Sequence, residues 1–253
     1  MPNYLSTISL KETLAQNPEY NAPLLNVIER GCDEDSIAVG NSVCIRDKIS
    51  SVYMLSVNMS NELSILLDRI NEENEKEKKE RVLMVNNSLF KNVIIEKFSN
   101  ASIKEYNLYV MEEKDYIPCT EVIEDFEITL LDLSWLDYIL SQYCDKEFGN
   151  KCYISDRIHN GPGLGLLYKG DKAAFVLQHK NGESGPLVVN KKYRAKGLGS
   201  YLLKHFNKIL FEKNTILYGL VEPDNKASAH MMVNSGYRLA ENNVLWVHCN
   251  EIL

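Results

Sequence analysis

The sequence predicts a mixed α/β protein (α+β) with two domains. Its composition, 45% hydrophobic and 25% charged residues in a chain of 253, is that of an ordinary globular protein. Some segments repeat apolar residues at helical spacing, and others carry short β-branched runs. The same alternation begins again near Asp125. We therefore expect an N-terminal domain over 1–123 and a C-terminal domain over 124–253.

In the first half, helices and strands alternate without a chemical motif. Ser60 is a good N-cap residue, and the apolar residues after it recur at helical spacing: Leu63, Leu66, Leu67 and Ile70. The charged run at 71–81 alternates acids and bases, which is typical of a solvated helix end and loop. The expected elements are helices after Ser60 and at 89–98, and strands at 52–55, 81–85 and 107–111.

The second half predicts an antiparallel meander followed by alternating helices and strands. Lys169-Gly170-Asp171 and Asn181-Gly182 are turn signals between short strands, so we expect two hairpins there. Trp135 and Trp246 are expected to pack inside. The expected strands span 126–131, 164–168, 173–178, 186–189, 215–221 and 244–248, and the helices span 133–143, 198–211 and 225–235.

Composition also limits the partners. A net charge of -7, from 28 basic and 35 acidic residues, repels a phosphate backbone on average, so we expect no nucleic acid. No apolar run approaches the ~20 residues that span a bilayer, so we expect no membrane. The six cysteines form no CxxC pair, and we expect no metal. The start resembles neither a signal nor a transit peptide, which favours the cytoplasm over the mitochondrial matrix. Monomer and homodimer both remain open.

One segment departs from the acidic average. Ser184 to Phe211 holds no Asp or Glu but has six cations, Lys191, Lys192, Arg194, Lys196, Lys204 and Lys208. Within it, the stretch 194–199 (RAKGLG) joins a predicted strand to a predicted helix. A glycine turn at a helix N-terminus presents unpaired N–H groups and the positive end of the helix dipole, which favour a phosphate. An ordinary turn with surface lysines is the alternative, because the GxGxxG nucleotide fingerprint is absent.

From Leu164 to Trp246 the sequence resembles the GNAT superfamily of acyl-CoA-dependent N-acyltransferases. The matching residues are Arg194, Gly197 and Gly199 of the (Q/R)xxGxG motif, Asn225 and Ser228 at the next helix, and Gly236-Tyr237. Asn181-Gly182-Glu183 followed by Lys192-Tyr193-Arg194 is similar to the glycine N-acyltransferase branch. The resemblance implies a GNAT fold, a mixed central sheet flanked by helices, and a degenerate GNAT-like N-terminal domain that shapes the acceptor site.

The resemblance also implies a co-substrate, acetyl-CoA or another acyl-CoA. The reaction would transfer an acetyl or short acyl group to the amine of a small molecule or amino acid. The implied cofactor contacts are Leu187, Val188, Val189, Arg194, Ala195, Lys196, Gly197, Leu198, Gly199, Ser200, Asn225 and Ser228.

The chemistry needs a neutral amine, whereas a free primary amine has a pKa near ~10. Glu183 aligns with the base of the glycine branch, although a Glu after Asn-Gly is often a solvated hairpin residue. His179 is the alternative base or a half-buried strand residue. Where many relatives place a proton-donating tyrosine, this chain has Met232, which cannot donate. Ser228 or water would then protonate the thiolate. Alternatively, the protein is a non-catalytic acyl-CoA-binding or interaction module, or a protein N-acetyltransferase.

Overall fold

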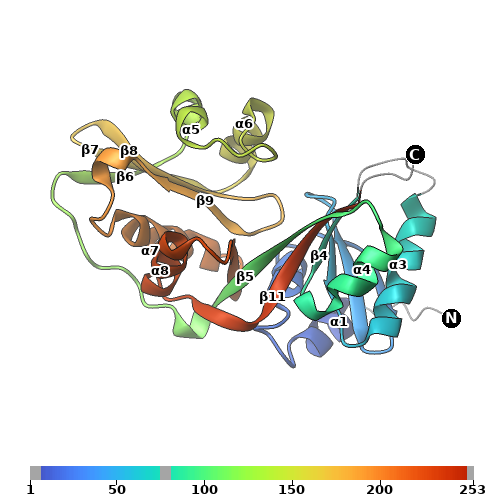
Figure 1. Ribbon diagram of the computed structural model, residues 1–253. Helices are drawn as coiled ribbons and strands as arrows, with labels where there is room; N and C mark the ends of the chain where they lie inside the picture. The colour runs from blue at the N-terminus through green and yellow to red at the C-terminus, as the bar shows by residue number, and fades with distance from the viewer. Residues whose placement is uncertain (1–6, 75–80, 250–253) are drawn as a thin grey trace. The chain divides into compact units, whose positions relative to one another are not determined.

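The computed structural model describes residues 7–74 and 81–249, and it has the predicted mixed α/β character (Figure 1). The strands are β1 Asp33–Val39, β2 Ser42–Asp47, β3 Tyr53–Ser56, β4 Arg81–Val85, β5 Ser102–Glu112, β6 Phe126–Leu130, β7 Gly163–Tyr168, β8 Asp171–Gln178, β9 Ser184–Val189, β10 Ile216–Val221 and β11 Arg238–Cys249. The α-helices are α1 Thr7–Leu14, α2 Ala22–Glu29, α3 Ser60–Asn74, α4 Lys91–Lys97, α5 Leu136–Gln142, α6 Lys151–Asn160, α7 Leu198–Phe211 and α8 Lys226–Asn234.

These strands form two sheets. A seven-stranded mixed sheet has the order β1-β2-β3-β4-β11-β5-β10, and a four-stranded sheet has the order β6-β7-β8-β9. The described chain divides into two compact units that are discontinuous in sequence. The first takes in the chain up to Val110, Leu220–Asn225 and the stretch from Leu239 on; the second takes in Met111–Gly219 and Lys226–Arg238. The expected division at 123/124 differs from this because β11 pairs antiparallel with β4.

In the first unit, α3 and α4 pack on one face of the sheet. The helix predicted after Ser60 is confirmed, and its four apolar residues are all fully buried. They pack in one cluster with alternate residues of the strands, among them Leu83 and Val85 of β4 and Leu245 and Val247 of β11. Alternation by two puts these strand residues on a single face. The remainder of the charged run, 75–80, lies outside the described residues.

In the second unit, the predicted three-stranded antiparallel meander is confirmed as β7-β8-β9, and β6 adds a fourth antiparallel strand beside β7. The turn between β7 and β8 has positive φ at both Lys169 and Gly170, as a tight hairpin turn requires. In Figure 1, α5 and α6 lie on one side of this sheet and α7 and α8 on the other. Phe175 and Leu177 of β8 face the first pair of helices, where they pack with Trp135. Trp135 is buried as predicted.

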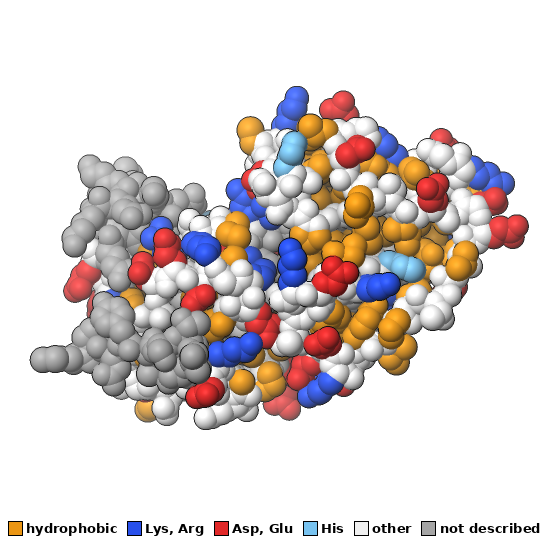
Figure 2. Space-filling view, turned by 180° about the vertical axis from the view of Figure 1, so that it is seen from behind, with side chains coloured by type: hydrophobic (Ala, Val, Ile, Leu, Met, Phe, Trp, Pro, Cys, Tyr) orange, Lys and Arg blue, Asp and Glu red, His pale blue; other side chains and the backbone are white. Residues whose placement is uncertain are grey.

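On the face drawn in Figure 2, Lys and Arg side chains are interspersed with Asp and Glu over the described surface. Among residues 7–74 and 81–249, no helix is long and apolar enough to cross a bilayer. The same part of the chain brings together no group of three or more His, Cys, Asp or Glu side chains fit to hold a metal ion. The six cysteines are free thiols, and Cys144 and Cys152 are exposed.

Candidate functional site

The phosphate-binding loop predicted from the sequence lies between β9 and α7, in the second unit. Asn190 begins it by accepting a hydrogen bond from the Lys192 backbone N–H at 3.1 Å, which closes a short 3₁₀ turn. The buried Tyr193 anchors that turn. The backbone then enters the left-handed region twice, at Ala195 (φ 61°) and Gly197 (φ 73°). Alanine in this region costs of order 1–2 kcal/mol, so the surrounding structure must hold the loop in this shape.

This loop presents backbone amides at the start of the 14-residue helix α7. The N-cap residue, Gly197, supplies no side-chain cap to those amides. Left-handed residues that alternate with others are the backbone pattern of anion-binding loops, in which successive N–H groups point to one side. The positive end of the helix dipole adds to it.

Uncompensated cations surround these amides. Arg194 donates from Nε to the carbonyl oxygen of Val189 at 2.9 Å, which fixes its guanidinium beside the end of β9. Lys191, Lys192 and Lys196 are exposed on the same loop. Within the described residues, no carboxylate pairs with Arg194 or Lys196. The loop therefore carries free positive charge next to unpaired amide donors.

The strand before the loop has an open edge. β9 is the end strand of its sheet, and β10 is the end strand of the other sheet. An end strand presents backbone N–H and C=O groups that its single neighbour does not pair. At about 3.3 Å per residue, β9 runs roughly 17 Å from Ser184 to Val189. An extended molecule could thus lie along it with one end at the loop and the other near Glu183.

Helix α8 closes the other side of the loop. A Cβ atom added to Gly199 would lie 3.0 Å from Met231 Sδ of α8 and 3.6 Å from Leu187 Cδ2 of β9, so loop, strand and helix converge on this glycine. Ser200 Oγ donates to the Met231 carbonyl oxygen at 3.4 Å. Ser228 is half-buried on α8, and Asn225 is exposed just before it. The structure thus brings together three elements that carry predicted cofactor contacts, namely the loop, β9 and α8.

Met232, which the sequence resemblance places where a proton donor is expected, is 2% exposed. A Cβ atom added to Gly219 of β10 would lie 2.6 Å from Met232 Cε and 3.6 Å from the Ser184 carbonyl oxygen. The side chain therefore fills the space between α8 and β10. A buried thioether in this position contributes packing and no proton.

The two candidate bases lie on the hairpin between β8 and β9, in different environments. His179 is buried, and its Nδ1 lies 2.8 Å from the Tyr153 hydroxyl oxygen. Burial lowers the pKa of His179 to about 4. Glu183 is half-buried; its backbone N–H donates to Asn181 Oδ1, and its carbonyl oxygen accepts from the His179 N–H. The geometry thus makes His179 an enclosed, weakly basic group.

An aromatic cluster that the sequence did not predict lies beside this hairpin. It consists of Tyr143, Phe148 and Tyr153, and the Phe148 ring packs edge-on to His179 at 4.9 Å between centroids. Burial is the main reason that the pKa values of both tyrosines are raised, and the Glu183 carboxylate contributes to each rise. Both phenols therefore remain neutral near that carboxylate. The five-residue spacing of the three aromatics was the available signal, but it fits neither helix nor strand periodicity.

A second buried network joins β9 to α7. The Tyr237 hydroxyl donates to Asn207 Oδ1 at 2.9 Å and lies 3.0 Å from Ser184 Oγ. The resemblance placed Gly236-Tyr237 at the end of the family motif without a role. In the structure Tyr237 ties the start of β9 to α7, and so supports the strand that leads to the loop.

Comparison with known proteins bears on the fold. Residues 163–247 match the family model described as FR47-like protein. No curated protein matches this chain. A Drosophila protein of known structure superposes with a TM-score of 0.69 at 17% identity, covering 99% of this chain and 98% of that one. A GCN5-related N-acetyltransferase from Kribbella flavida superposes with a TM-score of 0.62 at 12% identity, covering 92% of this chain and 96% of that one. A tandem GNAT protein from the clavulanic acid biosynthesis pathway superposes with a TM-score of 0.50 at 9% identity, covering 100% of this chain and 99% of that one. The chain therefore has a GNAT-like fold.

Proposed function

We propose, from the GNAT-like fold of this chain, that it is an acyl-CoA-dependent N-acyltransferase. It would transfer an acetyl or short acyl group to the amine of a small molecule or amino acid. The observation that carries the proposal is the loop 194–199, which places exposed amides and unpaired cations at the N-terminus of α7, directly after the open edge of β9.

Binding would use backbone groups more than side chains. The loop amides and Arg194 would hold the pyrophosphate of CoA, and the free edge of Leu187 to Val189 would pair with the pantetheine arm. Gly199 leaves room where a side chain would meet Met231 and Leu187. Asn225 and Ser228 would line the other side of the arm. The fit is electrostatic and steric, because a phosphate needs donors and close backbone approach.

In the proposed reaction, the amine nitrogen attacks the thioester carbonyl carbon. The C–N bond forms, the C–S bond breaks, and the Glu183 carboxylate takes the proton that the amine loses. The neutral wall of Tyr143 and Tyr153 helps, because a poorly solvated site disfavours the charged ammonium form. The leaving thiolate takes a proton from water or from Ser228. His179 is the weaker choice of base because it is enclosed and hydrogen-bonded to Tyr153.

A narrower proposal concerns the branch of the superfamily. Asn181-Gly182-Glu183 on the hairpin and Lys192-Tyr193-Arg194 before the loop favour a glycine N-acyltransferase-like enzyme. The structure adds reasons for two of these residues: Asn181 is buried and orients Glu183, and Tyr193 anchors the loop. An amino-acid amine is the acceptor class that this branch implies.

The test is release of free thiol from acetyl-CoA across a panel of amines, amino acids and short peptides. Glu183→Gln should lower kcat by about 10²–10⁴-fold, because the glutamine cannot accept the proton, and leave CoA binding unchanged. Glu127→Gln, the same substitution at an exposed position on β6, is the matched control and should keep full activity. Undiminished turnover in Glu183→Gln would remove Glu183 as the base.

A rival function is a non-catalytic acyl-CoA-binding module, and the buried Met232 favours it, since the usual proton donor is missing. The same assay separates the two. CoA binding without thiol release on any acceptor in the panel would favour the rival. Turnover on a peptide N-terminus alone would favour a protein N-acetyltransferase.

A further inference from the structure

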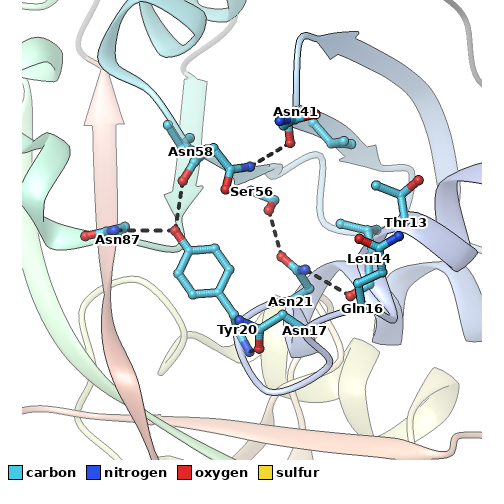
Figure 3. Close-up of a pocket in the computed structure, with 12 residues that line it drawn as sticks. Thr13, Leu14, Gln16, Asn17, Tyr20, Asn21, Asn41, Ser56, Asn58 and Asn87 are labelled. Atoms are coloured by element: carbon cyan, nitrogen blue, oxygen red, sulfur yellow. Dashed lines mark hydrogen bonds between the residues drawn. The ribbon is translucent and has the colours of Figure 1, made fainter.

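A polar pocket of about 470 Å³ lies within the first unit (Figure 3). Its wall comes from the end of α1 and the segment after it, the turn between β1 and β2 with the start of β2, the end of β3 with the two residues after it, and Asn87 after β4. This volume falls within the range of about 300–1,000 Å³ that is usual for small-molecule sites. In Figure 3, Asn41 and Asn58 lie on one side of the space and Gln16 and Asn17 on the opposite side. We call it the asparagine pocket.

The wall of the asparagine pocket carries no formal charge. Nine of its twelve side chains are uncharged and polar, three are aliphatic, and none is Asp, Glu, Lys, Arg or His. Its one titratable lining side chain is Tyr20. Burial raises the pKa of Tyr20 while a hydrogen bond from Asn87 lowers it, and the net rise keeps the phenol neutral. An ion that entered this space would lose hydration without meeting an opposite charge, and this desolvation is costly. A neutral polar molecule carries no charge to desolvate, and the wall can replace its hydrogen bonds to water.

Three of the polar side chains, those of Asn21, Tyr20 and Asn58, are held in place by hydrogen bonds. Asn21 donates to the Leu14 carbonyl oxygen at 2.9 Å and accepts from Ser56 Oγ at 2.7 Å. Tyr20 donates from its hydroxyl to the Val57 carbonyl oxygen at 2.8 Å. Asn58 donates to the Asn41 carbonyl oxygen at 2.6 Å. Because these groups are already ordered in the free protein, ligand binding would not carry the entropic cost of fixing them.

The turn that carries Asn41 is fixed from outside the pocket. The Glu62 carboxylate accepts from the Asn41 backbone N–H at 3.3 Å and from Ser42 Oγ at 2.6 Å. Gly40 has φ 57°, and a Cβ atom there would lie 2.0 Å from Glu62 Oε1, so the turn requires glycine. The carboxylate thus builds the wall, and it is not one of the lining groups.

Hydrogen-bonding capacity remains on this wall. A carboxamide offers two N–H donors and an acceptor oxygen. Within the described residues, the amide oxygen of Asn58 and the side-chain amide of Gln16 take no hydrogen-bond partner, and only one N–H of Asn58 is used. Both donors and acceptors therefore remain available on the wall. A ligand with several hydroxyl groups matches this pattern, since each hydroxyl both donates and accepts.

We propose that the asparagine pocket binds a neutral polyhydroxylated small molecule, a sugar or a cyclic polyol. The site lies apart from the acyl-CoA loop in sequence and in compact unit, and it goes beyond the proposed acyltransferase activity. The match rests on three features together: a volume suited to a small molecule, a wall without charge, and fixed amides with unused donors and acceptors.

The experiment is isothermal titration calorimetry of the full chain without acyl-CoA, so that it does not depend on acyltransferase activity. The probes are glucose and myo-inositol, with glucose 6-phosphate and glucuronate as charged counterparts. We expect saturable binding of at least one neutral probe at concentrations up to about 10 mM, and at least about tenfold weaker binding of the charged probes. No saturable heat with either neutral probe, or equal or tighter binding of the charged probes, would overturn the proposal.

Asn58→Leu tests the wall itself. Asn58 is exposed, and the substitution removes its donors and acceptor while keeping its backbone hydrogen bond to Ser42 Oγ. It should weaken binding of the neutral probe about tenfold. Asn92→Leu makes the same change on an exposed face of α4, outside the pocket, and should bind like the wild type. Circular dichroism checks that both variants fold. Equal affinity in Asn58→Leu and the wild type would contradict the assignment.

Discussion

His179 illustrates at the scale of one residue how burial decides a role. It is enclosed by Tyr153 and Phe148, and burial lowers its pKa from 6.5 to about 4, with Arg157 lowering it further and Asp145 opposing. The unfolded chain takes up a proton near pH 6.5 that the folded chain refuses. The stability contribution of the neutral ring is therefore complete above pH 6.5 and is lost as the pH falls toward about 4.

We predict a corresponding pH dependence of folding. Between pH 6.5 and about 4, this residue removes up to about 3 kcal/mol from the free energy of unfolding, so His179→Gln should lose correspondingly less over that range than the wild type. Urea unfolding at several pH values measures this difference. His159→Gln, at an exposed position on α6, should behave like the wild type. An unchanged pH slope in His179→Gln would show that the ring is not enclosed.

Residue environments were predictable where the signal is local. Burial of Trp135 follows from its place in an apolar helical pattern, and the hairpin at Asn181-Gly182 follows from its turn residues. What Trp135 packs on was not predictable. A Cβ atom on Gly165 would lie 2.3 Å from Trp135 Cζ2, a contact between residues 30 positions apart in the chain. Tyr143 and Tyr153 likewise come near Glu183 only through the fold, since 30 or more positions separate them from it in the sequence.

At the scale of elements, β11 is an inner strand of the seven-stranded sheet and contributes side chains to the core of the first unit. Leu245 is fully buried and packs in the core of the first unit with α3 and α4. Leu239 lies on the same strand and is 54% exposed. The strand thus carries the same residue type in two environments, which allows a matched comparison.

We predict that Leu245→Ala lowers the free energy of unfolding by about 2–5 kcal/mol, because it leaves a cavity in the core. Leu239→Ala should change it by no more than about 0.5 kcal/mol. Chemical denaturation followed by circular dichroism measures both. Similar values for the two variants would contradict the placement of β11 in the first unit.

Elements with dense periodic patterns were predicted well. The predicted helix at 198–211 coincides with α7, whose apolar residues recur at helical spacing over 14 residues. Helix α6 was not predicted because it has few apolar residues. Its two buried residues are Ile154 and the charged Arg157. β11 begins six residues earlier than its predicted start at Val244. There Asn242 and Asn243 donate to Asn86 O and Glu105 Oε1, partners more than 130 residues away.

At the scale of the whole molecule, the net charge of -7 conceals an uneven distribution. The acid-free segment from Ser184 to Phe211 forms β9, the loop and α7. Four of its six cations, Lys191, Lys192, Arg194 and Lys196, lie just before the N-terminus of α7. The place of the loop between a strand and a helix was predictable from local chemistry and the GNAT resemblance, and its role in binding phosphate stays a prediction. The assignment of the last strand to the first unit was not predictable, because nothing in residues 238–249 indicates that they pair with β4.

The central claim is that this loop binds the pyrophosphate of CoA, and calorimetric titration of CoA into the wild type and Gly199→Glu tests it most directly. We predict saturable binding to the wild type and none to Gly199→Glu, because the added carboxylate would meet Met231 and Leu187 and repel the phosphates. Lys208→Glu, which brings an acid to an exposed position near the far end of α7, should still bind CoA. Wild-type affinity in a folded Gly199→Glu variant, or no binding to the wild type, would contradict the account.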